Sequence, residues 1–145
     1  MTLVNKIIQS FRTDLTVLYG NAVDLNDIVE NVKIGNGVIV LMQEIVDSKL
    51  VFSPLQHAYC EQAETLLFFL TTSVYDRDSL ENETRIEVCK KELVRWLLQF
   101  AAHNSDIRLS GDIRLSRVYE KTDTILTGLA VSLTIREDVG IGICG

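Results

Sequence analysis

The sequence predicts an α+β fold in which a mostly antiparallel β-sheet packs against two α-helices. The chain has 145 residues, of which 47% are apolar, and this is the size and composition of a single globular domain. Two segments space their apolar residues as amphipathic helices do, and four are rich in the β-branched and aromatic residues typical of strands. The expected order is α-β-β-α-β-β, which disfavours parallel crossovers because helices and strands do not alternate strictly. We expect residues 1–137 to form the domain and the glycine-rich residues 138–145 to form a flexible tail.

The first 46 residues predict one helix and one strand. Residues 3–13 space their apolar side chains as a helix does, and Thr2 is suited to be its N-cap. This spacing is set by Val4, Ile7, Ile8, Phe11 and Leu15. Glycines and asparagines mark loops across residues 20–37 and leave room for one helical turn near 24–30. The run GVIVLMQEIV then predicts a buried strand that begins at Val38.

The middle of the chain predicts a loop, a strand and a long helix. Residues 47–64 have a weak pattern and hold the only proline, Pro54, so we expect a loop or a hairpin arm there. Residues 65–75 are rich in Phe, Thr, Val and Tyr and predict a strand. Asp78 and Glu81 then fit a capping box, and the helix is expected to end near residues 103–104. Its apolar stripe consists of Ile86, Cys89, Leu93, Trp96, Leu97 and Phe100.

The four residues Ile-Arg-Leu-Ser occur twice, at 107 and at 113, and two copies are too few for a repeat array. In a continuous strand, or in a hairpin that turns at Gly111 and Asp112, the apolar members share one side. The apolar side holds Ile107, Leu109, Ile113 and Leu115, and the polar side holds Arg108, Ser110, Arg114 and Ser116. The simplest interpretation is two short β-segments with one binary pattern; the alternative is an exposed arginine face that docks a partner. Residues 116–138 predict two further strands with a turn near 121–123.

The residues that carry chemistry in enzymes do not form a recognisable motif in this sequence. There is no P-loop and no nucleophile elbow, and the C-terminal GIGICG has no following helix that would bind a phosphate. His57 and Cys60 have the spacing of metal ligands, but zinc needs two more. The remaining candidates, Cys89 and His103, are about 21 Å apart along the predicted helix. A nucleophile pair of Cys60 with His103 has no support in the pattern. We therefore expect no enzymatic activity, no cofactor and no metal.

Charge and composition also limit the partners. The net charge of −6 disfavours nucleic-acid binding through the whole surface. The three cysteines do not indicate a secreted disulfide framework, and the N-terminus is not a signal peptide. The longest apolar run, around TLLFFL, is too short to span a bilayer. We expect a protein made in a cytosol, with neither a membrane nor a specific nucleic-acid sequence as its partner.

The order of the elements resembles that of the small tail-terminator proteins of long-tailed phages, the lambda-like ones in particular. The resemblance covers about residues 3–137 and is one of pattern and element order. The segments that carry it are LVNKIIQSF, GVIVLMQEIV, AETLLFFLTTSVYD, RIEVCKKELVRWLLQF and SRVYEKTDTILTGLAVSLTI. The chain departs from many members of that family in its glycine-rich tail and in having no proline before the first strand.

The resemblance implies a structural protein of the virion, assembled in the host cytoplasm. Such a subunit forms a hexameric ring that caps the tail tube and joins the neck, so its partners are itself, the tail-tube protein and the connector proteins. A head–tail connector or a tail-tube protein of the same fold is the alternative within this class. A small α+β enzyme or ligand-binding domain, with a site built from scattered residues, is the alternative outside it.

A closed ring repeats one heterologous contact, so each subunit needs two different complementary patches. One candidate is the basic side that carries Arg108, Arg114 and Arg117. The other is the acidic region 76–83, which carries Asp76, Asp78 and Glu81. We hypothesise that these two patches pair between neighbouring subunits.

Overall fold

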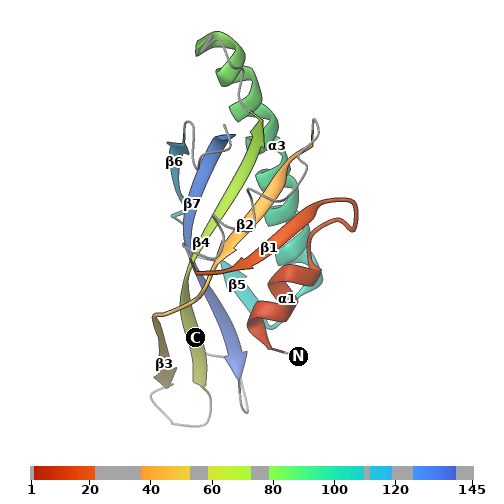
Figure 1. The fold of residues 1–145 in the computed structure, drawn as a ribbon. Coiled ribbons are helices and arrows are strands. Elements are labelled where there is room, and N and C mark those ends of the chain that lie inside the picture. Colours follow the sequence, from red (N-terminus) through yellow and green to blue (C-terminus); the bar gives the residue numbers. More distant parts are fainter. Residues whose placement is uncertain are drawn as a thin grey trace.

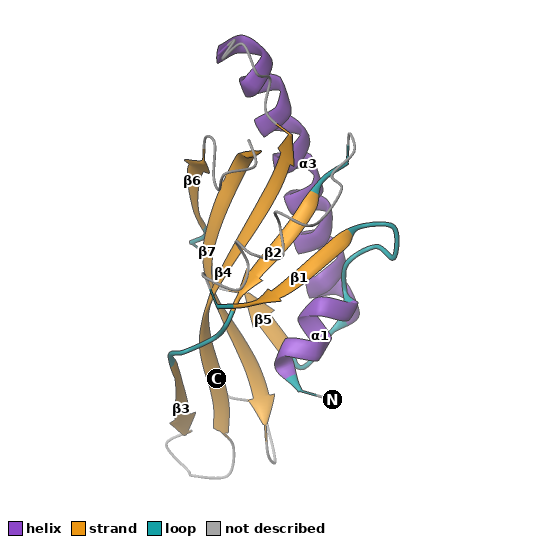
Figure 2. Ribbon diagram, viewed as in Figure 1, coloured by secondary structure: helices purple, strands orange, loops and turns teal. Residues whose placement is uncertain are grey.

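The computed structural model describes residues 2–21, 37–52, 59–72, 79–109, 112–118 and 126–139 (Figures 1 and 2). The elements in these ranges follow the order α1 (Leu3–Gln9), β1 (Thr16–Gly20), β2 (Ile39–Gln43), β3 (Ser48–Phe52), β4 (Tyr59–Thr72), α3 (Ser79–His103), β5 (Ile107–Leu109), β6 (Arg114–Val118) and β7 (Leu126–Val139).

One mixed sheet of seven strands forms the framework of the described residues. Its main path runs β1-β2-β4-β7-β5, while β3 lies beside β4 and β6 lies beside β7. The two central strands pair antiparallel along all 14 of their residues, from Tyr59 opposite Val139 to Thr72 opposite Leu126. β1 and β2 are parallel, with Thr16 opposite Ile39, and the remaining pairs are antiparallel. The fold is therefore α+β with a mixed sheet.

The predicted α+β class is confirmed, whereas the predicted sheet and element order are only partly right. The parallel strand β1 was not expected, although residues 21–38 exceed the dozen or so residues that a parallel connection needs. β3 forms in the segment expected to be a loop or a hairpin arm and ends at Phe52, and Pro54 lies outside the described residues. β4 begins at Tyr59 rather than at residue 65, because its first residues pair on both sides, with β3 and with β7.

The helix-covered face of the sheet carries the main core. The predicted stripe of α3 is buried there, with Leu97 packed at its margin, against strand residues such as Leu67, Phe69 and Val131. α1 packs against the same cluster through Ile7, and Phe11 just beyond it stacks on Trp96 with ring centroids 5.0 Å apart. A second, smaller cluster lies on the opposite face of the sheet and comprises Ile39, Leu41, Phe68, Leu70 and Leu126.

The two helices begin close to where the sequence predicts. Thr2 caps α1, since its hydroxyl accepts a hydrogen bond of 3.2 Å from the Asn5 amide. α1 ends at Gln9 rather than at residue 13, because the Ser10 hydroxyl donates to the Ile7 carbonyl and closes the last turn. α3 spans 25 residues and ends at His103, as predicted. The proposed cap at Asp78 lies outside the described residues.

The repeated Ile-Arg-Leu-Ser copies form β5 and β6, two segments of one interrupted edge strand along β7. Leu109 lies opposite Ile135 and Arg114 lies opposite Ser132, so four residues of the edge strand span two residues of β7. An insertion of two residues preserves the alternation of a strand, so the apolar members of both copies face the helix side. Because β5 and β6 both run antiparallel to β7, they point in the same direction and do not pair as a hairpin; the residues expected at its turn are described only from Asp112 onward. β7 itself continues to Val139, and residues 140–145 of the predicted tail lie outside the described part.

Candidate interaction surfaces

One end of the sheet is formed where its two long strands extend beyond α3 (Figure 1). There, residues 59–63 of β4 pair with residues 135–139 of β7, and β3 lies along the other side of β4. Figure 1 shows β3 and these strand ends at the opposite end of the sheet from the start of α3. We call β3 together with residues 59–63 the arm.

The arm exposes apolar side chains on one face. Leu50 is 56% exposed and Phe52 is 59% exposed. They lie two residues apart on β3, so both point to the same side, where their partners across the ladder are Glu61 and Tyr59. The Phe52 and Tyr59 rings touch, with centroids 5.5 Å apart. We call these residues the arm patch: an apolar surface with one half-buried carboxylate, Glu61, beside it.

A second apolar surface lies on the side of α3 that faces away from the sheet. Leu98 is 70% exposed and Val94, one turn earlier, is 45% exposed. Lys91 and Arg95 flank this pair and are themselves exposed. The sheet-facing stripe of α3 is filled by core residues, and Val94 and Leu98 lie outside the core that the described residues form. We call Val94 and Leu98 with the two flanking bases the outer stripe.

The arginines expected to form the basic patch lie on two different faces of the sheet. Arg108 and Arg114 point to the face away from α3, where Arg108 forms an ion pair of 3.0 Å with Asp138. Arg117 points to the helix side and forms an ion pair with Glu83 of α3. One basic and one acidic member of the hypothesised patches thus meet within a single chain. A contact of this kind between copies stays a prediction.

The structure describes little of the predicted acidic patch. Asp76 and Asp78 lie outside the described residues, and Glu81 lies in the first turn of α3, where only the backbone is described. Tyr75 and Tyr119, both near expected strand ends, also fall outside.

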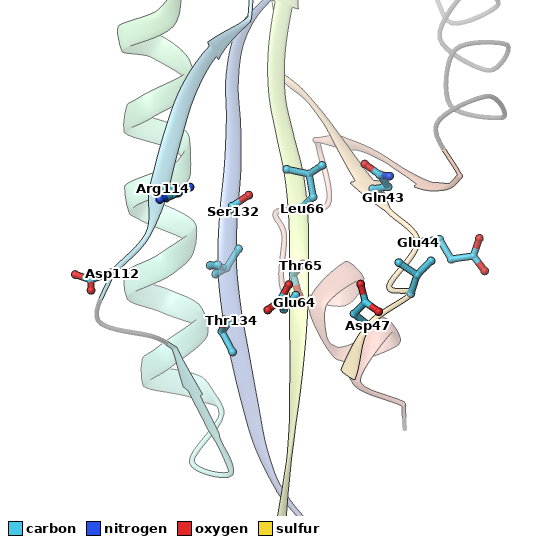
Figure 3. Close-up of a pocket in the computed structure, with 12 residues that line it drawn as sticks. Gln43, Glu44, Asp47, Glu64, Thr65, Leu66, Asp112, Arg114, Ser132 and Thr134 are labelled. Atoms are coloured by element: carbon cyan, nitrogen blue, oxygen red, sulfur yellow. The ribbon is translucent and has the colours of Figure 1, made fainter. Parts of the chain in front are cut away.

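A shallow groove of about 510 Å³ crosses the face of the sheet away from α3. Figure 3 shows that its polar side chains come from β2, β4, β6 and β7 and the turns beside them. Its charged groups are four carboxylates and one guanidinium, those of Glu44, Asp47, Glu64, Asp112 and Arg114. In Figure 3, Glu44 and Asp112 lie at opposite ends of the groove and point away from its centre. The carboxylates are therefore spread out, and no three metal-ligating side chains cluster among the described residues.

The strongest electrostatic cluster of the described chain joins α1 to the sheet. Lys6 Nζ lies 2.8 Å from Asp106 Oδ2 and 2.5 Å from Glu137 Oε2. The hydrogen bond to Asp106 raises the pKa of Lys6, and the same bond lowers the pKa of Asp106. Lys6 and Asp106 thus hold each other in the charged state, and the ion pair of Lys6 with Glu137 fixes the N-terminal helix against β7.

The cysteines that the structure describes are suited to the core and not to chemistry. Cys60 and Cys89 are both fully buried and form no disulfide. Burial raises the pKa of the Cys89 thiol to about 12, and the nearby Glu92 carboxylate adds to the effect. A thiol with so high a pKa is a poor nucleophile at neutral pH. His103, at the end of α3, contacts the Gln99 carbonyl through Nδ1, while His57 lies outside the described residues.

No protein-family model matches this chain, and no curated protein matches it significantly. The resemblance to tail terminators therefore stays a resemblance of pattern. Within the described ranges, neither helix has the length and apolar character needed to cross a membrane.

The sequence did not reveal the two apolar surfaces. The arm patch lies in SKLVF, a five-residue run whose apolar residues resemble those of any short buried strand. The outer stripe was detectable in principle, because Val94 and Leu98 are spaced by four residues on the side of the helix opposite the predicted stripe.

Proposed function

We propose that the protein is a non-catalytic structural subunit that assembles into a closed ring, as the phage tail terminators it resembles do at the head–tail junction. In this role it caps the tail tube and contacts the tube and neck proteins in the virion. The order of its elements is compatible with that family, and its sheet is antiparallel except where β1 pairs with β2. The assignment to a phage particle rests on this analogy of fold alone.

The observation that supports an assembling protein best is the arm. Its strands extend beyond the helix layer and carry Leu50 and Phe52 more than half exposed on one face. Single exposed apolar residues are ordinary on monomers, but a shared exposed face on a projecting sheet is typical of a surface that a partner covers. The open groove, in which Glu44 and Asp112 point away from the centre, is by contrast poorly suited to enclose a small substrate.

The experiment is a measurement of native mass at low and high protein concentration, followed by electron microscopy of the particles. We expect a closed oligomer, a hexamer in the terminator reading, seen as single rings with a central opening. Rings that stack into open-ended tubes would favour the tail-tube alternative. A monomer that gains thermal stability on binding a small molecule would favour the ligand-binding alternative and contradict the proposal.

A head–tail connector forms single rings as well, so the partner decides between the two. A terminator binds the ends of isolated tail tubes, whereas a connector binds the portal side of filled heads. Binding to neither structure would contradict a role at this junction.

A further inference from the structure

We infer that the arm patch of one copy docks onto the outer stripe of α3 in the next copy. This inference rests on the proposed assembly and names the surfaces that make its contact. The two surfaces are different parts of one chain, so the contact is heterologous, the type of contact that generates a ring when its rotation closes.

The first argument is chemical likeness. Both surfaces are apolar at their centres, with Leu50 and Phe52 on one and Val94 and Leu98 on the other. Three of these four side chains are about half exposed, and Leu98 is 70% exposed. Placing one surface on the other removes apolar area from water on both at once, which is the main favourable term in protein association.

The second argument is charge. The arm patch has the carboxylate of Glu61 beside Leu50, its partner across the ladder. The outer stripe has the guanidinium of Arg95 about one turn before Leu98 and the ammonium of Lys91 about two turns before it. Arg95 also approaches Glu92 at 3.6 Å, but its side chain is 48% exposed and keeps donors toward solvent. In the inferred contact, the acidic edge of the arm patch faces the basic edge of the outer stripe. Opposite charges at the edges of two surfaces favour and orient the association of the two copies.

The third argument is the size of the surfaces. A stable pairwise interface buries roughly 800 Å² on each partner. The four partly exposed side chains and their neighbours offer too little area for one such contact to be stable alone. In a closed ring, however, each copy makes the contact twice, once with its arm and once with its helix. A weak contact that is used twice by every copy favours closure over isolated pairs.

The direct test is cross-linking between two variants that each carry one introduced, exposed cysteine. Leu50→Cys and Leu98→Cys are made in the full chain with Cys144 replaced by serine, which leaves only the buried Cys60 and Cys89. We expect a short bismaleimide to join the two variants when they are mixed and to leave either variant alone mostly uncoupled. Coupling of Leu98→Cys to itself without a mixed product would overturn the inference, because it would indicate a two-fold contact between helices.

A second test exchanges the charges. Glu61→Lys is expected to weaken self-association roughly 10-fold, as expected for loss of one well-placed charge pair of about 1.4 kcal/mol. Adding Lys91→Glu and Arg95→Glu in the same chain is expected to restore it. Failure of the combined variant to restore association, with its thermal melt intact, would count against the pairing.

A matched control is available on the same helix. Val88 is 47% exposed, but it lies about 80° around α3 from Leu98 and about 15 Å along it. Leu98→Ser is expected to raise the dissociation constant roughly 10- to 100-fold, and Val88→Ser is expected to leave it unchanged.

The outcomes separate this inference from the proposed function. A ring in which Leu50→Cys and Leu98→Cys never couple leaves the ring standing and overturns the pairing. Mixed coupling within a dimer that forms no ring supports the pairing and contradicts the ring. A protein that stays monomeric at every concentration overturns the pairing, and the role at the head–tail junction is then decided by binding to tube ends.

Discussion

Gly128 lies at a close approach of the two central strands, and the structure predicts that even one added methyl group is not tolerated there. It is the cross-strand partner of Leu70. A Cβ built on Gly128 would lie 1.9 Å from the Phe69 carbonyl oxygen and 2.9 Å from the Leu70 Cα. Non-bonded heavy atoms pack at about 3.5–4.0 Å, so the first of these distances is roughly 1.5–2 Å too short.

The neighbours of Gly128 cannot relieve this overlap by rotating a side chain, because the atoms in the way belong to the β4 backbone. Gly128→Ala must instead push β7 away from β4 and weaken their ladder. Overpacking of this kind costs about 3 kcal/mol or slightly more. For a chain of this size, that loss lowers the melting temperature by about 10 °C.

The measurement is thermal unfolding followed by circular dichroism. Gly37→Ala is the matched control, because a Cβ there has no atom within 4 Å. We expect Gly37→Ala to leave the melting temperature unchanged or to raise it slightly, since alanine restricts the unfolded chain. A melting temperature for Gly128→Ala within about 2 °C of the parent would refute the close approach of β4 and β7 at this point.

Three further predictions concern the packing of α1 and the reactivity of the core. Lys6→Met is expected to lower stability most between about pH 4 and pH 10.5. In the parent, the stabilisation by the ion pair is lost at low pH, as the pH falls through the lowered pKa of Asp106 in the folded protein. It is lost at high pH as the pH rises through the raised pKa of Lys6 in the folded protein. Urea titrations of both proteins across this range check it, and a difference that does not change with pH would contradict it. Ser10→Ala is expected to cost about 1–2 kcal/mol in the same titrations, because the Trp96 indole N–H loses its 2.6 Å acceptor; a Trp96→Phe background should reduce the effect to the part that comes from the Ser10 bond to the Ile7 carbonyl. Cys89 is expected to resist a thiol reagent at pH 8 in the folded protein and to react fully in denaturant; fast reaction in the fold would contradict its burial.

The parts of the fold that the sequence predicted are those fixed by local periodicity. The stripe of α3 from Ile86 to Phe100 recurs at helical spacing and is buried as expected. The alternation around Ile107 and Ile113 also held, because an interruption of two residues leaves the parity of a strand unchanged.

The parts that the sequence did not predict depend on partners far away in the chain. Five residues from Thr16 to Gly20 become a strand only because β2 runs alongside them in parallel. The residues from Ser48 to Phe52, for which a loop and a hairpin arm were both left open, form a strand because the first residues of β4 lie opposite them. Short strands carry too little periodic signal to be recognised alone, since their stability comes from cross-strand pairs.

The candidate surfaces were predicted less well than the fold, for the same reason. Arg114 and Arg117 are three residues apart in one strand, so strand alternation places them on opposite faces, and Arg117 meets Glu83 from 34 residues away. A count of charges along the sequence groups these arginines into one patch, whereas the pleat separates them. The apolar arm patch was missed because its exposure depends on where the helix layer ends, which only the assembled sheet determines.

Because β4 extends beyond the helix layer, one part of this strand belongs to the core and another part lies in the arm. Leu67 and Phe69 of β4 form the main core with the helices, whereas the residues of β3, which pair with the same strand farther along, are largely exposed and lie outside that core. Replacing Phe52 by serine should therefore weaken self-association and leave the melting temperature unchanged, whereas Gly128→Ala should lower the melting temperature itself. A surface that the fold does not need for its own stability, and that is costly to leave exposed to water, is explained by a partner that covers it. If Phe52→Ser instead lowers the melting temperature as much as Gly128→Ala does, the arm belongs to the core and the argument for a partner fails.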